Sequence, residues 1–145
     1  MNLLLKILLF IWQLPQNLVG LFIIYVLNNK KTRIKKTIDY IDVWFVKNGV
    51  FKCGVSLGNY ILLYNEKYNS PKVGTRFLNN TIHHERGHQK QSKYFGFFYF
   101  LFIGLPSLWV NIRNRIFKRG SNWYYTQYPE NWADKLGDVH RWDPV

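Results

Sequence analysis

The chain has 145 residues, which fits one domain of ordinary size. It is 48% hydrophobic and carries 20 Lys and Arg residues against 8 Asp and Glu residues, which gives a net charge of +12. The single cysteine, Cys53, excludes an internal disulfide and any Cys-x-x-Cys metal or redox site, so a metal would need histidine and carboxylate ligands. The basic excess alone fits either anionic membrane headgroups or nucleic acid.

Residues 1–29 are predicted to form a membrane anchor or a membrane-inserted hairpin. Residues 3–27 are almost wholly apolar, interrupted by Lys6 and by a polar step around Pro15. About 25 residues are enough for one kinked span of a ~30 Å hydrocarbon layer, whereas a hairpin around Pro15 would stay within one leaflet. A cleaved signal peptide is disfavoured because no small-x-small site follows. The basic run at 30–36, by the positive-inside rule, places the rest of the chain in the cytoplasm.

Residues 30–145 are predicted to form an α+β domain that begins with a small antiparallel β meander. Residues 41–46 are β-branched and aromatic, and Asn48-Gly49 is a dipeptide that type I′ turns favour, so we expect a hairpin over 41–51. A further apolar run at 60–64 is expected to complete the meander.

A loop at 67–74 is predicted to lead into the first long helix of this domain. The polar side chains at 79–81 can serve as N-caps, so the helix is expected to start near Ile82 and to include residues 83–93.

His84-Glu85-Arg86-Gly87-His88 is a His-Glu-x-x-His motif on this predicted helix. Positions i and i+4 share a helix face, so His84 and His88 can reach one ion while Glu85 addresses a water bound to it. Zn²⁺ lowers the pKa of its bound water to about 7, and a neighbouring carboxylate can take the proton. Zn²⁺ is therefore the predicted cofactor, and Gly87 can let another segment approach the helix. The alternative is a solvated helix face whose histidines are incidental.

A catalytic zinc usually takes a third protein ligand. The third histidine of the metzincin pattern is absent, because position 94 is Tyr94. Instead, Glu130-Asn131-Trp132-Ala133-Asp134 lies on a short helix predicted over 130–136, after Pro129 and ending at Gly137. Glu130 and Asp134 share a face, so Glu130 can bind zinc while Asp134 orients an imidazole. The alternative is an ordinary helix N-terminus whose acidic residues face the helix dipole.

His-Glu-x-Gly-His followed by Glu-x-x-Ala-Asp resembles the gluzincin zinc metallopeptidases, in particular the membrane-embedded Ste24-like branch, or a minimal gluzincin. The resemblance implies a zincin-like domain acting on a peptide or protein, with Glu85 as general base and acid. It implies that the metal ligands are His84, His88 and Glu130, with Asp134 supporting an imidazole. It also implies a substrate-binding edge strand, for which 55–64 is the candidate.

The group that stabilises the reaction's oxyanion is not determined by these motifs. The candidates are polar side chains near the end of the chain: Tyr124, Tyr125, Tyr128, His140 and Arg141, with Tyr128 and His140 placed first.

Residues 95–110 form a second apolar block between the two motifs. If His84 and Glu130 share one ion, this block cannot simply cross a membrane, and its ~16 residues are fewer than the ~20 that a span needs. It is expected either to turn back within one leaflet at residues 104–106, or to be a buried or interfacial helix. The basic residues at 113–119 are then expected on the same surface as those at 30–36, against anionic lipid headgroups.

These patterns predict a membrane-attached zinc metallopeptidase whose active site faces the cytoplasm. Two other classes compete with it: a catalytically inactive zinc-binding membrane protein, and a basic protein that binds membrane surfaces or nucleic acid. Nucleic acid is the less favoured partner, because the basic residues cluster next to the apolar blocks instead of along one exposed groove.

Overall fold

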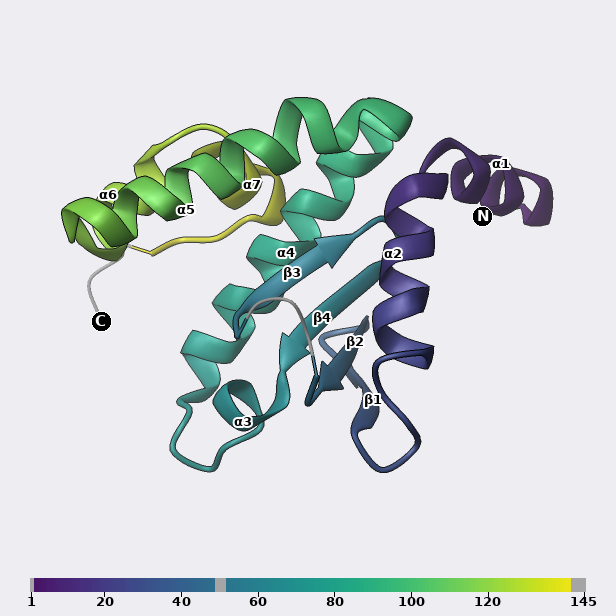
Figure 1. Cartoon of the computed structure of the whole chain (residues 1–145), viewed down its shortest axis with the longest axis horizontal. Coiled ribbons are helices and arrows are strands. Elements are labelled where there is room, and N and C mark those ends of the chain that lie inside the picture. The colour runs from purple at the N-terminus through teal and green to yellow at the C-terminus, as the bar shows by residue number, and fades with distance from the viewer. Residues whose placement is uncertain (1, 49–51, 142–145) are drawn as a thin grey trace.

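The computed structural model describes residues 2–48 and 52–141 and confirms the α+β class. The chain has two N-terminal helices, a four-stranded sheet and a largely helical second half (Figure 1). In chain order, the elements are α1 Leu3–Trp12, α2 Leu14–Tyr25, β1 Arg33–Ile38, β2 Ile41–Val46, β3 Gly54–Leu57, β4 Tyr60–Tyr64, α3 Asn65–Tyr68, α4 Thr75–Phe95, the 3-10 helix η1 Gly96–Phe98, the π-helix η2 Phe100–Gly104, α5 Leu105–Phe117, α6 Gly120–Thr126 and α7 Glu130–Gly137.

The strands form one mixed sheet in the order β1-β2-β4-β3, so the predicted antiparallel meander is wrong. β1 and β2 make a hairpin whose two-residue turn, Asp39-Tyr40, has positive φ at both positions, as a type I′ turn requires. β3 and β4 make a second antiparallel hairpin, whereas β2 and β4 run parallel. The turn predicted at Asn48-Gly49 falls partly outside the described residues.

β4 takes a central place because its apolar side chains are buried on both faces of the sheet. Ile61 and Leu63 pack into the core on one face and Leu62 packs on the other, each at most 1% exposed. A strand buried on both sides has a continuous apolar sequence, unlike the alternating strand of a half-exposed hairpin. The shorter β3, which contains Gly54 and Ser56, lies at the edge.

Helices α4 and α2 cover opposite faces of the sheet (Figure 1). The core on the α4 side consists of Ile41, Val43, Phe45, Ile61, Leu63, Tyr68 and Ile82. The core on the α2 side consists of Ile23, Ile24, Val46, Leu57 and Leu62. Alternate residues of β2 and β4 contribute to the two cores, as the two-residue period of a strand requires. One face of α4 is thus held against the sheet.

The N-terminal apolar segment forms two helices, with an angle of 90° between α1 and α2. Within the described residues no single helix is long and apolar enough to cross a membrane, so the predicted membrane helix is not found; the bent pair reaches that length and composition only when both parts are counted. Gln16 and Asn17 of α2 are fully buried. Gln16 donates to the Gly96 carbonyl, and Asn17 accepts from the Asn59 N–H at 2.8 Å. α2 is therefore fixed to the domain, whereas α1 exposes most of its side chains.

The helix that carries the histidine motif starts earlier than predicted. α4 begins at Thr75, and the proposed N-cap residues at 79–81 lie inside it. Thr81 satisfies its hydroxyl within the helix by donating to the Phe77 carbonyl at 2.9 Å, which is why a polar side chain is tolerated there. The predicted loop at 67–74 is shorter, because its first two residues complete α3.

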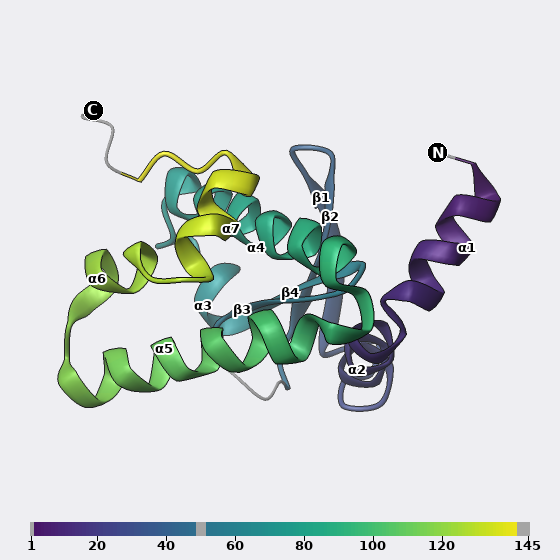
Figure 2. The same ribbon diagram turned by 90° about the horizontal axis from the view of Figure 1, so that it is seen from above.

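The apolar block at 95–110 changes direction at Gly96 and not at residues 104–106. Gly96 has φ +51°, and a Cβ there would lie 2.0 Å from Trp12 Cε2, so only glycine fits. Gly104 and Leu105 both have helical backbone angles, so η2 runs directly into α5. The re-entrant turn is therefore wrong, and the block is helical along one side of the molecule (Figure 2).

The two basic segments were predicted to lie on one surface. The end of α5 and the loop before β1 lie at different ends of the molecule (Figure 1). Both nevertheless lie on the side of the molecule that carries α2 and α5 (Figure 2).

Candidate metal centre

The two motif helices are held together by glycines at their contact. A Cβ on Gly87 of α4 would lie 1.9 Å from the carbonyl oxygen of Ala133, and one on Gly137 of α7 would lie 2.0 Å from the carbonyl oxygen of His83. Gly87 therefore allows α7 to approach α4 closely, as its place in the motif predicted. Gly137 was expected to end α7 through its own conformation, but the left-handed residue is Asp138, with φ 59°.

Gly87→Ala is expected to separate α4 from α7. The new methyl group meets a rigid backbone carbonyl, and such overpacking lowers the free energy of unfolding by about 1–3 kcal/mol or more. Gly74→Ala is the matched control, because nothing lies within 4 Å of a Cβ at that position; only the helix-cap preference changes, at a cost of at most ~1 kcal/mol. Denaturant unfolding of both variants measures the difference, and equal stabilities would contradict the tight contact.

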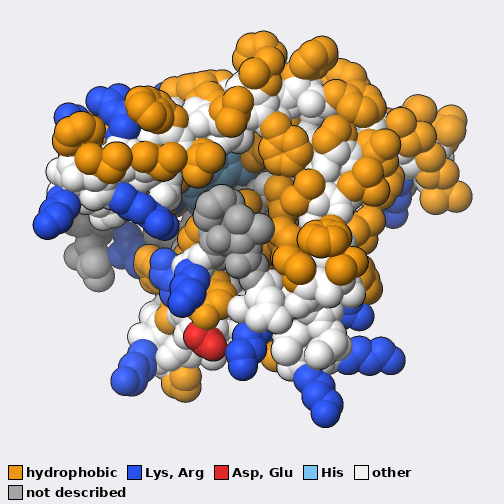
Figure 3. Space-filling view, in the orientation of Figure 1, with side chains coloured by type: hydrophobic (Ala, Val, Ile, Leu, Met, Phe, Trp, Pro, Cys, Tyr) orange, Lys and Arg blue, Asp and Glu red, His pale blue; other side chains and the backbone are white. Residues whose placement is uncertain are grey.

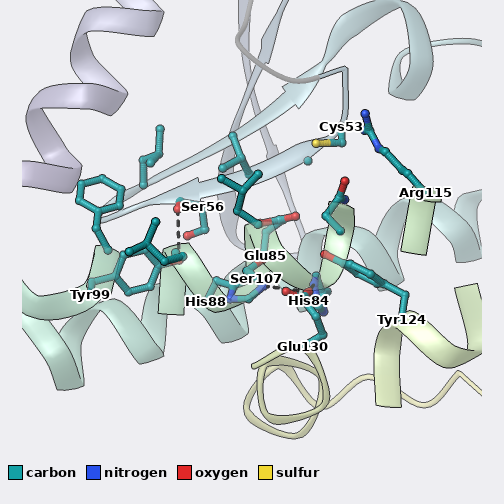
Figure 4. Close-up of a pocket in the computed structure, with 18 residues that line it drawn as sticks. Cys53, Ser56, His84, Glu85, His88, Tyr99, Ser107, Arg115, Tyr124 and Glu130 are labelled. Carbon is teal, nitrogen blue, oxygen red and sulfur yellow. Dashed lines mark hydrogen bonds and ion pairs between the residues drawn. The ribbon is translucent and has the colours of Figure 1, made fainter. Parts of the chain in front are cut away.

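This contact brings His84, His88 and Glu130 together, as the sequence predicted (Figure 4). One potential ligand atom from each residue lies within 4.8 Å of the others, and all three residues are buried. Glu130 Oε2 is 3.1 Å from His84 Nε2 and 3.4 Å from His88 Nε2. The three side chains could therefore hold one metal ion.

The other nitrogen of each imidazole has an oxygen acceptor. His84 Nδ1 is 2.7 Å from the Asp134 carboxylate, and His88 Nδ1 is 2.7 Å from Gln91 Oε1. Because both partners are acceptors, each Nδ1 carries the hydrogen, and the Nε2 of a neutral ring then has a free lone pair. Both lone pairs point towards Glu130, the orientation that metal binding needs.

Glu130 fits a metal ligand for a further reason. Its side chain is fully buried, and among the described residues its Oε1 atom has no partner at full hydrogen-bond geometry, although the Tyr124 hydroxyl interacts with the carboxylate. Burial opposes ionisation, but when the His88 and His84 rings are protonated, their charges and hydrogen bonds hold the pKa of Glu130 well below its usual range. A buried carboxylate with one unpaired oxygen is costly unless a cation or donor satisfies it.

Asp134 is itself fixed by Arg141. The guanidinium donates to both carboxylate oxygens, at 2.6 and 2.8 Å, and stacks over the Tyr125 ring at 3.3 Å. The ring of Tyr125 contacts His84 edge-on, with centroids 5.2 Å apart. Arg141 and Tyr125, both considered for the oxyanion, therefore support the imidazole of His84.

Glu85 lies beside the three candidate ligand residues and is not one of them. It projects from α4 towards the edge strand, where a Cβ on Gly54 would lie 2.7 Å from Glu85 Oε1. Its side chain is buried, and this burial raises the pKa of the Glu85 carboxyl; the charges that His84 and His88 carry when protonated oppose the shift. The carboxyl therefore reaches the space between the motif helix and β3.

That space is a cavity of about 430 Å³. Its walls are β3 on one side, α4 on another, and η2, α5 and α6 opposite; the metal-site residues and Glu85 lie on its surface (Figure 4). Arg115 lines it near Cys53. A bound molecule in this cavity would contact the edge strand, Glu85 and the metal site at once.

Of the oxyanion candidates, the structure brings Tyr124 into the cavity. Its hydroxyl points towards the metal site (Figure 4), and burial and the charge of Glu130 raise its pKa. Tyr128 and His140, placed first from the sequence, lie elsewhere. The Tyr128 hydroxyl donates to the Phe102 carbonyl at 2.9 Å, and His140 is exposed, 3.3 Å from Asp138.

Gln91 is a site residue that the sequence interpretation missed. It accepts from His88 and donates to the Pro129 carbonyl at 3.1 Å, so it links the candidate ligand His88 to the residue before Glu130. Its i+3 spacing from His88, which places both on one helix face, was the available signal.

Gln91→Ala is expected to lower metal affinity about 10- to 100-fold, because His88 loses the acceptor that orients it. Competition with a chromogenic zinc chelator measures this affinity. Gln89→Ala, a partly exposed glutamine on the same helix, is the control and should leave affinity unchanged. Equal affinities in the two variants would remove Gln91 from the site.

No family model, curated protein or solved structure matches this chain. The case for a function therefore rests on the residues and their geometry.

Proposed function

We propose that this protein is a membrane-attached zinc metallopeptidase of the gluzincin type, with a zincin-like catalytic domain. The observation that carries the proposal is the convergence of two imidazoles and a carboxylate, with a second glutamate beside them in a cavity bordered by a strand edge. An accidental motif on a solvated helix would not bury all three ligand residues and pair both outer imidazole nitrogens.

The donor set favours zinc. Magnesium and calcium prefer shells made of oxygen ligands, whereas two imidazole nitrogens and one carboxylate oxygen suit Zn²⁺ and leave a coordination position open. When bound, zinc supplies Lewis-acid activation of water and of the substrate carbonyl. His84, His88 and Glu130 would hold it, with Asp134 and Gln91 keeping the imidazoles in the required tautomer.

Glu85 is the proposed catalytic residue. Its carboxylate takes a proton from the water that attacks the scissile carbonyl carbon and gives a proton to the amide nitrogen as the C–N bond breaks. Tyr124, whose hydroxyl faces the same space, is the proposed donor to the carbonyl oxygen as negative charge develops on it.

The substrate is proposed to bind along β3. This strand is at the edge of the sheet and lines the cavity, so its outer backbone groups can pair with an extended peptide. The candidate segment 55–64 is thereby narrowed to β3, because β4 pairs with strands on both sides.

Attachment to a membrane, with the site on the cytoplasmic side, remains part of the proposal. It is supported by α1, whose leucine and isoleucine side chains are largely exposed, and by the basic residues that follow α2.

Peptide cleavage tests the proposal directly. The purified full chain is incubated with a peptide mixture, and new termini are identified by mass spectrometry. New termini should appear, disappear after chelation and return when Zn²⁺ is restored. Zinc-loaded protein that cleaves nothing would favour an inactive zinc-binding protein instead.

A further inference from the structure

The helical segment η2–α5 has two different apolar faces. One face lines the cavity through Phe100, Gly104, Leu105, Ser107, Leu108, Asn111 and Arg115. Other apolar side chains, from the end of η1 onwards, recur at helical spacing and are exposed; we call Phe98, Leu101, Trp109, Ile112 and Ile116 the outer stripe. Leu105 is exposed at the border between the two faces. A helix that is apolar on its solvent side needs a partner there, and Trp109 and Ile116 are 61% and 66% exposed.

The outer stripe continues onto α2. The side of α2 that faces away from the sheet exposes Leu18, Val19, Phe22 and Tyr25. Helices α5 and α2 lie on the same side of the molecule, opposite the β1–β2 turn (Figure 2). Hydrophobic side chains cover both helices in one view of the surface (Figure 3). The exposed apolar side chains of α5 and α2 therefore form one face built by distant segments.

The charges around this face indicate which kind of partner it can bind. From Arg86 to Pro129 the chain contains no acidic residue, and none precedes Asp39. Four cations follow the outer stripe or lie within it: Arg113, Arg115, Lys118 and Arg119. A second copy of this chain, also at +12, would be repelled, and nucleic acid offers bases that stack on aromatic rings but no apolar surface for leucine and isoleucine side chains. Anionic phospholipid offers both acyl chains and negative headgroups.

We propose that the outer stripe and the exposed side of α2 form one docking face for an anionic lipid bilayer. α5 then lies in the plane of the interface, with acyl chains on its outer side and the cavity on its inner side. The face is distinct from α1, which could insert without bringing α5 to the lipid.

The docking face also contains the opening of the cavity. A hollow lies beside α5 on this face, with a histidine visible at its bottom (Figure 3). The substrate class follows from the proposed peptidase function, on which only this sentence rests: the site takes peptide segments held at the lipid surface.

Single fluorescent labels test the docking face without requiring catalysis. In a Cys53→Ser background, separate variants Leu101→Cys, Ile112→Cys, Phe22→Cys and Tyr40→Cys are labelled with an environment-sensitive dye. Tyr40 is the control: it is fully exposed, at the β1–β2 turn on the opposite side. Each protein is mixed with phosphatidylcholine vesicles with or without about one-third phosphatidylserine.

On the anionic vesicles, the labels at 101, 112 and 22 should shift to shorter wavelength and be quenched by spin-labelled lipid. The label at 40 should do neither, and added salt should weaken the response. The four labels should respond in the same way when the protein also carries Glu85→Gln. A failure of the peptidase proposal can therefore be distinguished from a failure of the docking face.

Three outcomes would overturn the docking face: no vesicle binding, vesicle-bound protein whose label at 112 still reports water, or an equal shift at 40. Trp109→Asp provides a second test without any label. It should reduce the bound fraction on anionic vesicles, whereas Tyr40→Asp should not.

Discussion

Glu85→Gln is expected to abolish peptide hydrolysis while the bound metal is retained. Glutamine has nearly the same shape, but its amide cannot take a proton from water, and loss of a general base costs about 10²- to 10⁴-fold in rate. The metal should stay because Glu85 lies outside the cluster formed by His84, His88 and Glu130.

The measurement pairs turnover with zinc content on the same sample. Glu66→Gln is the matched control, since Glu66 is exposed and its carboxylate accepts a hydrogen bond from Tyr64 at 2.6 Å, away from the cavity. Full activity in Glu85→Gln would remove this residue from the mechanism. Loss of zinc together with activity would make Glu85 a structural residue.

Glu130→Gln is expected to lose both the metal and the activity. The substitution removes the anionic ligand from between the two imidazoles, and the buried amide cannot restore its charge. We expect zinc affinity to fall by at least ~100-fold, which is ~2.7 kcal/mol of binding free energy. The stabilisation that excess zinc gives the folded state should fall with it.

Thermal unfolding with and without added Zn²⁺ measures how much the metal stabilises the folded state. Asp138→Asn is the control: Asp138 is an exposed acidic residue directly after α7, in a left-handed conformation that asparagine tolerates. Zinc should raise the melting temperature of the control as in the wild type. An equal shift in Glu130→Gln would exclude Glu130 as a ligand.

Short-range spacing made the ligand set predictable. His84 and His88 are four residues apart on one helix, and Glu130 and Asp134 are four apart on another, so each pair shares a face regardless of the rest of the fold. The prediction that the two helix faces meet rested on chemistry. A catalytic zinc needs a third protein ligand, and the sequence offers few acidic residues that could supply it. The structure places Asp134 against His84, where it was expected.

Long-range packing was not predictable in the same way. The parallel pairing of β2 with β4 depends on which strand is buried on both faces, and local turn signals carry no information about strand order. Tyr124 reaches the cavity because α6 folds back over it, whereas Tyr128, only four residues later, bonds to Phe102. Residues so close in sequence can be distinguished only by the path of the chain.

The start of α4 and the path after it were mispredicted for local reasons. Polar residues at 79–81 resembled N-caps, but their side chains are accommodated within a longer helix. The Gly-Leu-Pro step at 104–106 resembled a turn, but proline is tolerated in the first turn of a helix, where α5 places it. The true change of direction, at Gly96, depends on its contact with Trp12, which is distant in sequence.

The central claim is that His84, His88 and Glu130 hold one zinc ion. X-ray absorption spectroscopy at the zinc edge, on protein purified without chelator or metal-affinity resin, tests it most directly. The account predicts one zinc per chain with two imidazole ligands and otherwise oxygen ligands, lost in His88→Ala. Protein without a transition metal, or zinc that His88→Ala retains with the same spectrum, would contradict it.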